Sequence, residues 1–329
     1  MPNSIALVRQ DAALLDPAEA QFRIPSPIAG LRLFLRHLPP RAHRPGASPV
    51  LYVHGGTFPS ALSIAHRFDG LSWREDLAAA GVDVWGLDFL GFGESDRYPE
   101  MAAAANAHPA LGGAETASRQ IEAAARFITG RHATTRLSII AHSWGSIAAG
   151  RFAARCPELV DRLVFFGPIP RRAGKTPPES FDAWRLVSLE DQWRRFTAEV
   201  PAGEAPVLAR RHFAEWGPLY LDSDPESRTR TPPSVKVPSG PWQDIANAFA
   251  GDLAYDPAAI RAPVAIIRGE WDSLITDEDA RWLFDAFVQA PIKRDVKIGR
   301  ATHLMHLEAG RHELYRAARS FLEEGPRPS

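Results

Sequence analysis

The sequence predicts an α/β fold, in which a mostly parallel β-sheet carries helices on both of its faces. Two observations lead to this prediction. Short apolar runs alternate with helical patterns along most of the chain, and 45% of the 329 residues are hydrophobic, which is enough to fill a large core. Parallel strands covered by helices on both sides have continuous apolar sequences rather than alternating ones, and the runs in this chain have that character.

Seven short runs have the apolar and β-branched composition of strands, and Gly, Pro or polar residues bound each of them. They are residues 30–38, 49–56, 81–89, 136–143, 161–168, 262–270 and 292–299. Between them, five stretches place apolar residues at spacings of three and four, which indicates amphipathic helices. These stretches are residues 71–80, 114–130, 144–155, 277–288 and 309–324.

The region from Pro168 to Ile260 breaks this alternation. It contains no run with the composition of a strand, and Arg, Trp and Pro are frequent in it. Pro-rich stretches such as residues 223–241 are typical of loops. We therefore expect an α/β core made of residues 1–167 and 261–329, and an insertion of helices and loops at residues 168–260.

Charge and composition exclude several classes of partner. The 38 basic and 39 acidic residues nearly cancel and form no long block of one sign, so we expect neither nucleic acid nor a membrane as a partner. The N-terminus has no signal-peptide pattern and no segment reaches the ~18 apolar residues of a membrane span, so we expect a cytoplasmic protein. The single cysteine, Cys156, excludes a disulfide framework. The oligomeric state stays open, a homo-oligomer included.

The stretch IIAHSWGSIAAG, residues 139–150, places Ser143 between a predicted strand and a predicted helix of small residues. A serine nucleophile on a tight strand-to-helix turn needs small residues two positions before and after it, so that strand and helix can approach each other. Ala141 and Gly145 occupy these positions. The alternative interpretation is an ordinary helix N-cap, where serine is also favoured.

A serine hydroxyl attacks a carbonyl only when a base takes its proton and a third group orients that base. Candidates for both follow predicted strands: Asp272 comes three residues after Gly269, and His303 lies in the loop after the last strand. Glu270 is an alternative orienting group and His306 an alternative base. We favour Asp272 and His303, and their order Ser, Asp, His resembles that of the α/β-hydrolase superfamily.

The resemblance to α/β-hydrolases extends over residues 28–324, apart from the insertion. VHGGT, residues 53–57, resembles the family's His-Gly segment, which implies an oxyanion hole made by the N–H of Gly56 or Thr57 together with that of Trp144. LDFLGFGESD, residues 87–96, resembles a loop that is usually structural in the family. The insertion lies where the family places its cap. The chain departs from the common pattern at Ala141, where glycine is more frequent.

The resemblance implies a serine hydrolase that cleaves a small or medium-sized apolar carboxylic ester, or a lactone, through an acyl-enzyme at Ser143. We expect tryptophans of the insertion to bind the substrate, while about half of its aromatic rings form its own core. The candidates are Trp184, Trp193, Trp216 and Trp242. The arginines of the insertion are expected to form a solvated face rather than a carboxylate site. They are Arg171, Arg172, Arg194, Arg195, Arg210 and Arg211.

Other functions stay open at this point. HGG with SWGS is similar to proline iminopeptidases, and carbon-carbon bond hydrolases are compatible too. Haloalkane dehalogenases and epoxide hydrolases use Asp at the position of Ser143, which disfavours both. A ligand-binding receptor or an inactive relative on the same fold is the alternative of another class. No cofactor or metal is expected, because GFG at residues 91–93 is no dinucleotide motif and HLMH at residues 303–306 lacks a third metal ligand.

Overall fold

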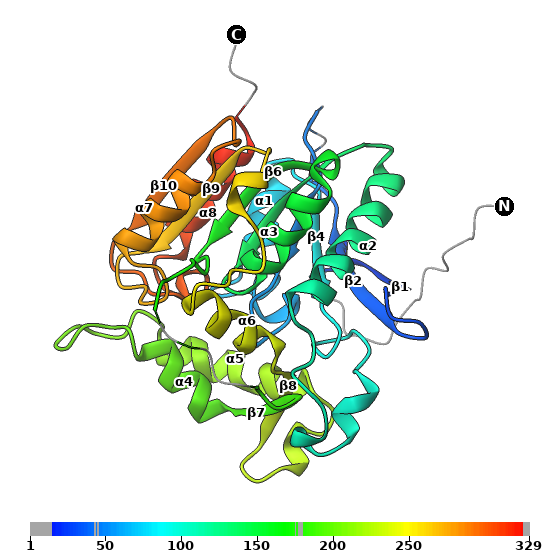
Figure 1. The fold of residues 1–329 in the computed structure, drawn as a ribbon, viewed down its shortest axis with the longest axis vertical. Helices are drawn as coiled ribbons and strands as arrows, with labels where there is room; N and C mark the ends of the chain where they lie inside the picture. The colour runs from blue at the N-terminus through cyan, green and yellow to red at the C-terminus, as the bar shows by residue number, and fades with distance from the viewer. Residues whose placement is uncertain (1–14, 43, 45, 175, 177–179, 325–329) are drawn as a thin grey trace.

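A central sheet of eight strands organises the computed structural model, which describes residues 15–42, 44, 46–174, 176 and 180–324 (Figure 1). In spatial order the strands are β1 (Ala20–Pro25), β2 (Arg32–Leu38), β4 (Val84–Asp88), β3 (Val50–Val53), β5 (Leu137–His142), β6 (Val160–Phe166), β9 (Val264–Gly269) and β10 (Lys293–Ile298). Within this sheet, as far as the structure describes it, the pairs β1–β2 and β2–β4 are antiparallel and the others are parallel. The predicted α/β class and the mostly parallel sheet are confirmed.

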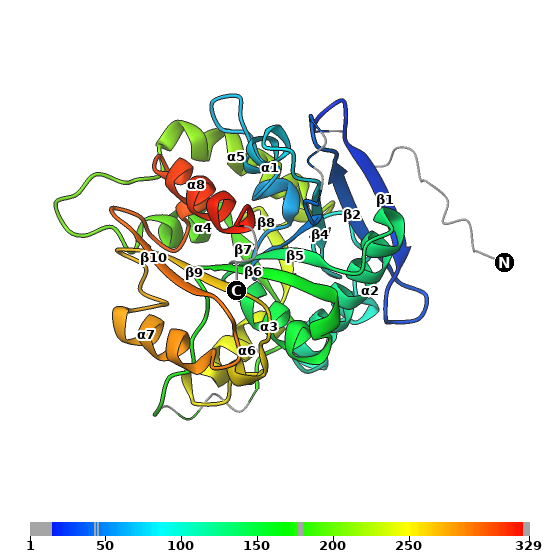
Figure 2. The same cartoon turned by 90° about the horizontal axis from the view of Figure 1, so that it is seen from above.

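Helices cover both faces of this sheet (Figure 2). The helices α1 (Trp73–Ala79) and α8 (Arg311–Leu322) lie on one face; α2 (Ala114–His132), α3 (Gly145–Arg155) and α7 (Asp277–Ala286) lie on the other. Each face has its own apolar core. Trp73 stacks on Tyr315 in the first, with ring centroids 5.1 Å apart, and Ile121 and Phe152 are fully buried in the second. The strands between them are therefore shielded from water on both sides.

Residues 168–260 lie at the carboxyl ends of the parallel strands, directly after β6 (Figure 1). They contain α4 (Leu189–Thr197), α5 (Arg210–Asp222) and α6 (Gly240–Phe249). A capping box begins α4, because Ser188 Oγ accepts the N–H of Asp191 at 3.1 Å and Asp191 Oδ2 accepts the N–H of Ser188 at 3.0 Å. Among the residues that the structure describes, no helix is both long and apolar enough to cross a membrane.

The prediction that strands are absent from the insertion is wrong. The strands β7 (Trp184–Ser188) and β8 (Ser234–Pro238) pair with each other in an antiparallel ribbon that is separate from the main sheet. Both are only five residues long, and charged side chains such as Arg185 and Lys236 interrupt their apolar residues. Strand β1, at the edge of the main sheet, was not expected either. Short edge strands of mixed polarity lack the apolar run that identifies a buried strand.

Two helical glycines allow a test of the packing between α3 and the segment before β9. A Cβ added to Gly150 would lie 2.6 Å from Tyr255 Cζ, whereas one added to the exposed Gly130 of α2 meets no atom within 4 Å. Alanine is intrinsically favoured over glycine in helices by about 1 kcal/mol. We expect Gly130→Ala to raise the free energy of unfolding by about 0.5–1 kcal/mol, and Gly150→Ala to lower it by about 1–3 kcal/mol through overpacking. Urea denaturation measures both values, and equal stabilisation by the two substitutions would contradict this packing.

Candidate active site

Ser143 occupies a strained turn between β5 and α3. Its φ is +54°, a conformation that is uncommon for residues other than glycine, and its N–H donates to the carbonyl of Phe166 on β6 at 3.1 Å. The turn is possible because Gly145 is small: a Cβ there would lie 2.4 Å from the carbonyl oxygen of His54. Trp144 is the N-cap of α3 and no side chain caps this helix, so the structure does not give Ser143 the capping role of the alternative interpretation.

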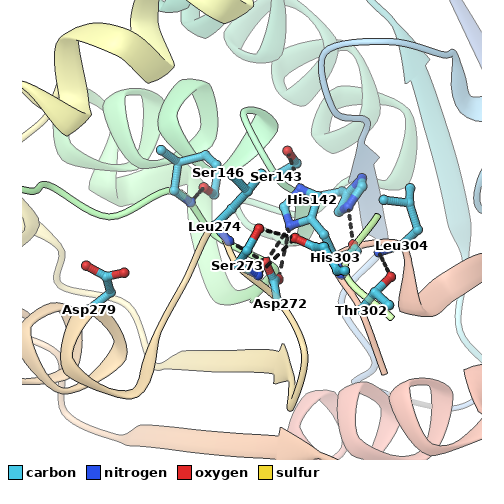
Figure 3. A network of polar contacts seen from close by, with 12 residues as sticks. His142, Ser143, Ser146, Asp272, Ser273, Leu274, Asp279, Thr302, His303 and Leu304 are labelled. Carbon is cyan, nitrogen blue, oxygen red and sulfur yellow. Dashed lines mark hydrogen bonds and ion pairs between the residues drawn. The ribbon is translucent and has the colours of Figure 1, made fainter. Parts of the chain in front are cut away.

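The side chains of Ser143, His303 and Asp272 form one hydrogen-bonded chain (Figure 3). His303 Nε2 lies 2.7 Å from Ser143 Oγ, and His303 Nδ1 lies 3.1 and 3.0 Å from the two carboxylate oxygens of Asp272. The three residues are 2–5% exposed. With a neutral imidazole, Nδ1–H donates to Asp272 and Nε2 accepts the hydroxyl proton of Ser143, which is the arrangement required for proton transfer from serine to histidine.

The structure places the two alternative residues elsewhere. Glu270 is exposed, and its carboxylate accepts the N–H of Arg300 at 2.8 Å. His306 is buried against Phe58, with ring centroids 5.9 Å apart, and burial lowers its pKa well below the usual value, so that its ring stays neutral. Neither residue hydrogen-bonds to His303, so the geometry favours Asp272 and His303 over these two alternatives.

The expected oxyanion loop lies directly against Ser143. A Cβ added to Gly55 would be 3.2 Å from Ser143 Cβ. Within the described part of the chain, no hydrogen bond uses the N–H of Gly56, Thr57 or Trp144. These three N–H groups therefore have no acceptor in the described part of the chain, as the predicted oxyanion hole requires.

His54 fixes the shape of this loop. Its Nδ1–H donates to the carbonyl of Gly55 at 2.7 Å, and its Nε2 accepts the N–H of Phe89 at 3.1 Å. Burial lowers the pKa of His54, so the ring is neutral and each nitrogen has one partner. The loop at residues 87–96 is held in turn by Asp88, whose carboxylate accepts the N–H groups of Ser60 at 2.9 Å and Glu94 at 3.1 Å. This is a structural role, as the sequence predicts for that loop.

Two carboxylates of the insertion reach the site, and no sequence motif predicts either of them. Asp244 of α6 accepts the indole N–H of Trp144 and the N–H of Ala114, both at 2.7 Å, and burial raises its pKa to about 6. Glu199 accepts the N–H of His303 at 2.8 Å and the N–H of Ser273 at 2.9 Å. One carboxylate therefore holds the loop of His303 and the residue that follows Asp272.

A third carboxylate, which is buried, supports the His303 loop from the core. Glu308 accepts the N–H of Thr302 at 3.1 Å and also the Thr302 hydroxyl. It is 1% exposed, and burial raises its pKa to about 7. No sequence motif identifies Glu308, because its role depends on a turn of six residues that folds back on itself.

The four predicted substrate-binding tryptophans have different surroundings. Trp242 lies beside the oxyanion loop, since a Cβ added to Gly56 would be 3.8 Å from its ring. Trp216 is 1% exposed, donates to the carbonyl of Leu62 at 2.9 Å and stacks on a tyrosine, so here it packs the insertion against the core. Trp184 donates to a carbonyl at residue 103, and Trp193 lies under an arginine of α5. Of the four, Trp242 has the contacts nearest to Ser143.

One group of potential metal ligands occurs among the described residues, at the opposite end of the sheet. It consists of His37, Asp83 and His132. Asp83 Oδ1 lies 2.8 Å from His37 Nε2 and accepts the indole N–H of Trp85 at 2.8 Å. These mutual hydrogen bonds explain why the three side chains lie close together. Residues 303–306 are not part of this group.

The family model described as the alpha/beta hydrolase fold matches residues 48–310. The chain belongs to this family. No curated protein sequence matches it.

Solved structures with the α/β-hydrolase fold cover nearly the whole chain. The 2-hydroxy-6-oxo-6-phenylhexa-2,4-dienoate hydrolase of Rhodococcus sp. strain RHA1 has a TM-score of 0.62 at 16% identity, with 93% of this chain and 99% of the other covered. The thioesterase domain from the curacin biosynthetic pathway has a TM-score of 0.59 at 16% identity, over 93% and 100%. A thermophilic esterase from Thermogutta terrifontis has a TM-score of 0.56 at 18% identity, over 92% and 97%. At these identities the likeness establishes the fold.

The contacts of Glu199 predict a positioning effect. Glu199→Gln keeps the size of the side chain but replaces one carboxylate oxygen by an amide NH₂ group. That group is a donor and would face the N–H of His303 or of Ser273, which is also a donor. We expect kcat for an aryl ester to fall about 10- to 100-fold, with KM changed less than about 3-fold, because the His303 loop loses its fixed position. Glu190→Gln, on the exposed face of α4, is the matched control and should leave both constants unchanged. An unchanged kcat in Glu199→Gln would show that the contact does not position His303.

Glu308 predicts a pH dependence of stability. Its pKa is about 7 in the folded protein against an ordinary value of 4.5, so between these pH values the folded state binds more protons than the unfolded state. The free energy of unfolding therefore falls as pH rises from 4.5 to 7, on the order of 3 kcal/mol in total. Glu308→Gln should remove this decrease in urea denaturation curves, and Glu313→Gln, exposed on α8, should not. Parallel pH curves for wild type and Glu308→Gln would contradict the prediction.

Proposed function

We propose that this chain is a serine hydrolase that cleaves a small or medium-sized apolar carboxylic ester, or a lactone, through an acyl-enzyme at Ser143. The observation that carries the proposal is the hydrogen-bonded chain from Ser143 to Asp272. A strained turn holds the Ser143 hydroxyl 2.7 Å from His303 Nε2, and the other ring nitrogen faces the buried carboxylate of Asp272.

The proposed mechanism assigns one role to each group. Ser143 Oγ attacks the carbonyl carbon while His303 Nε2 takes its proton, and Asp272 stabilises the imidazolium that forms. The negative charge on the carbonyl oxygen is stabilised by the N–H of Trp144 and that of Gly56 or Thr57, with a contribution of about 3–4 kcal/mol per donor. His303 then protonates the leaving alcohol. Water attacks the acyl-enzyme in a second step that uses the same base.

Two features support an ester with an apolar body. The ring of Trp242 lies beside Gly56, so an apolar surface borders the proposed oxyanion hole. The structural relatives named above include an esterase and a thioesterase, which supports carboxylic ester chemistry; the dienoate hydrolase among them keeps cleavage of a carbon-carbon bond as the runner-up.

The test compares kcat/KM for short aliphatic esters, aryl or branched esters, long-chain esters and N-terminal proline amides. We expect aryl or branched esters to be hydrolysed best, and Ser143→Ala to lower their turnover by about 10³- to 10⁶-fold. Ser320→Ala, exposed on α8, is the matched control and should retain wild-type rates.

Other substrate preferences would favour other functions. A preference for long-chain esters would contradict a small or medium-sized substrate, and a preference for proline amides would favour the iminopeptidase alternative. The absence of turnover on every ester and amide would favour a ligand-binding protein on the same fold.

A further inference from the structure

One arginine of the insertion differs from all the others in its partners. The structure describes nine arginines between residues 168 and 260. Five of them pair with carboxylates: Arg172, Arg194, Arg211, Arg228 and Arg230. Three lie over tryptophan rings: Arg171, Arg185 and Arg210. Arg195 of α4 has neither kind of partner among the described residues. Burial lowers its pKa and the negative charge of Glu199 raises it, but the two side chains form no ion pair.

Arg195 lies at the expected oxyanion loop. Its Nη1 donates to Thr57 Oγ1 at 2.6 Å, and Thr57 is 3% exposed and directly follows Gly56. A guanidinium has five N–H donors, and the described part of the chain supplies an acceptor for only one of them. The nearby carboxylate of Glu199 is already occupied by the N–H groups of the two neighbouring loops. Burial lowers the pKa of Arg195 to about 10, so it remains a cation at neutral pH.

One buried polar side chain near the loop of Thr57 also lacks partners. His306 is 2% exposed, and neither of its ring nitrogens has a hydrogen bond among the described residues. The ring of His306 stacks on that of Phe58, the residue after Thr57, with ring centroids 5.9 Å apart, so it lies near the loop that Arg195 contacts.

An unpaired buried polar group costs about 1–3 kcal/mol, and native proteins rarely leave several of them together. The half-buried cation of Arg195 on Thr57 and the buried, partnerless ring of His306 on Phe58 therefore indicate a place for a ligand group that accepts hydrogen bonds. The planar fork of a guanidinium matches a carboxylate, which can accept two of its N–H groups at once.

We propose that Arg195 anchors a free carboxylate of the substrate, with His306 as a further donor. The substrate is then an ester whose body is apolar and which carries a second, unesterified carboxyl group. The inference rests on the proposed hydrolase function where it names an ester as the substrate. The binding of a carboxylate by Arg195 does not depend on that function. It also corrects the expectation of a solvated arginine face in the case of Arg195. Arg194, next to it, is 68% exposed and fits that expectation.

The kinetic test uses two esters of equal size, 4-nitrophenyl hydrogen glutarate and its neutral counterpart 4-nitrophenyl glutaramate. We expect the wild type to prefer the carboxylate ester by at least about 10-fold in kcat/KM. Arg195→Gln should lose about 10- to 100-fold on the carboxylate ester and less than about 3-fold on the amide-bearing ester. Arg194→Gln, the matched control on the same helix, should change neither value. Equal losses on both esters in Arg195→Gln would show that Arg195 only holds Thr57, and would overturn the proposal.

A binding test separates this proposal from the proposed function. Glutaranilic acid and its neutral amide, N-phenylglutaramide, require no turnover, and calorimetry on the full chain with Ser143→Ala compares their affinities. We expect the acid to bind at least about 10-fold more tightly, and Arg195→Gln added to Ser143→Ala to abolish the difference. If Arg195→Gln does not fold, Arg195→Lys, which keeps the charge and loses the fork, should give an intermediate difference. Equal affinities for acid and amide would overturn the proposal even if ester hydrolysis is observed.

Discussion

The positive φ of Ser143 is the constraint on which the site depends. A residue with a side chain in this conformation is strained by about 1–3 kcal/mol, and only the surrounding structure can hold it there. Strand β5 and helix α3 fix the turn from both sides, because Gly145 lies against the carbonyl of His54 and Phe166 accepts the N–H of Ser143. The same turn leaves the N–H of Trp144 without a partner and brings the serine hydroxyl to His303.

The insertion contributes to the same site from the other side. Glu199 binds the N–H groups of His303 and Ser273, Asp244 binds the indole of Trp144, and Arg195 binds Thr57. The insertion therefore touches the loop of every proposed catalytic group. Ser143 is 4% exposed in this arrangement. Through Glu199 the insertion is bonded directly to the loop of His303.

The sequence was sufficient for features that depend on local patterns. Apolar runs in the sequence identify the parallel strands, and small residues around Ser143 identify the turn. Asp272 and His303 can be recognised because each follows a predicted strand. Glu199 and Asp244 carry no such local signal, because each acts on residues about 70 to 130 positions away. The sequence predicts a solvated face for Arg195, as for the other arginines of the insertion. The turn of about 100° between neighbouring helix positions exposes Arg194 and directs Arg195 to Thr57, and sequence spacing alone does not show which residue faces the core.

The central claim is that Ser143 is a nucleophile activated by His303. The most direct measurement treats the protein with a fluorophosphonate and locates the adduct by peptide mass spectrometry. We expect one adduct, on the peptide that contains Ser143, and labelling at least about 10³-fold slower in His303→Ala, because the hydroxyl is then without its base. An adduct on another serine, or labelling of Ser143 at the wild-type rate in His303→Ala, would contradict it.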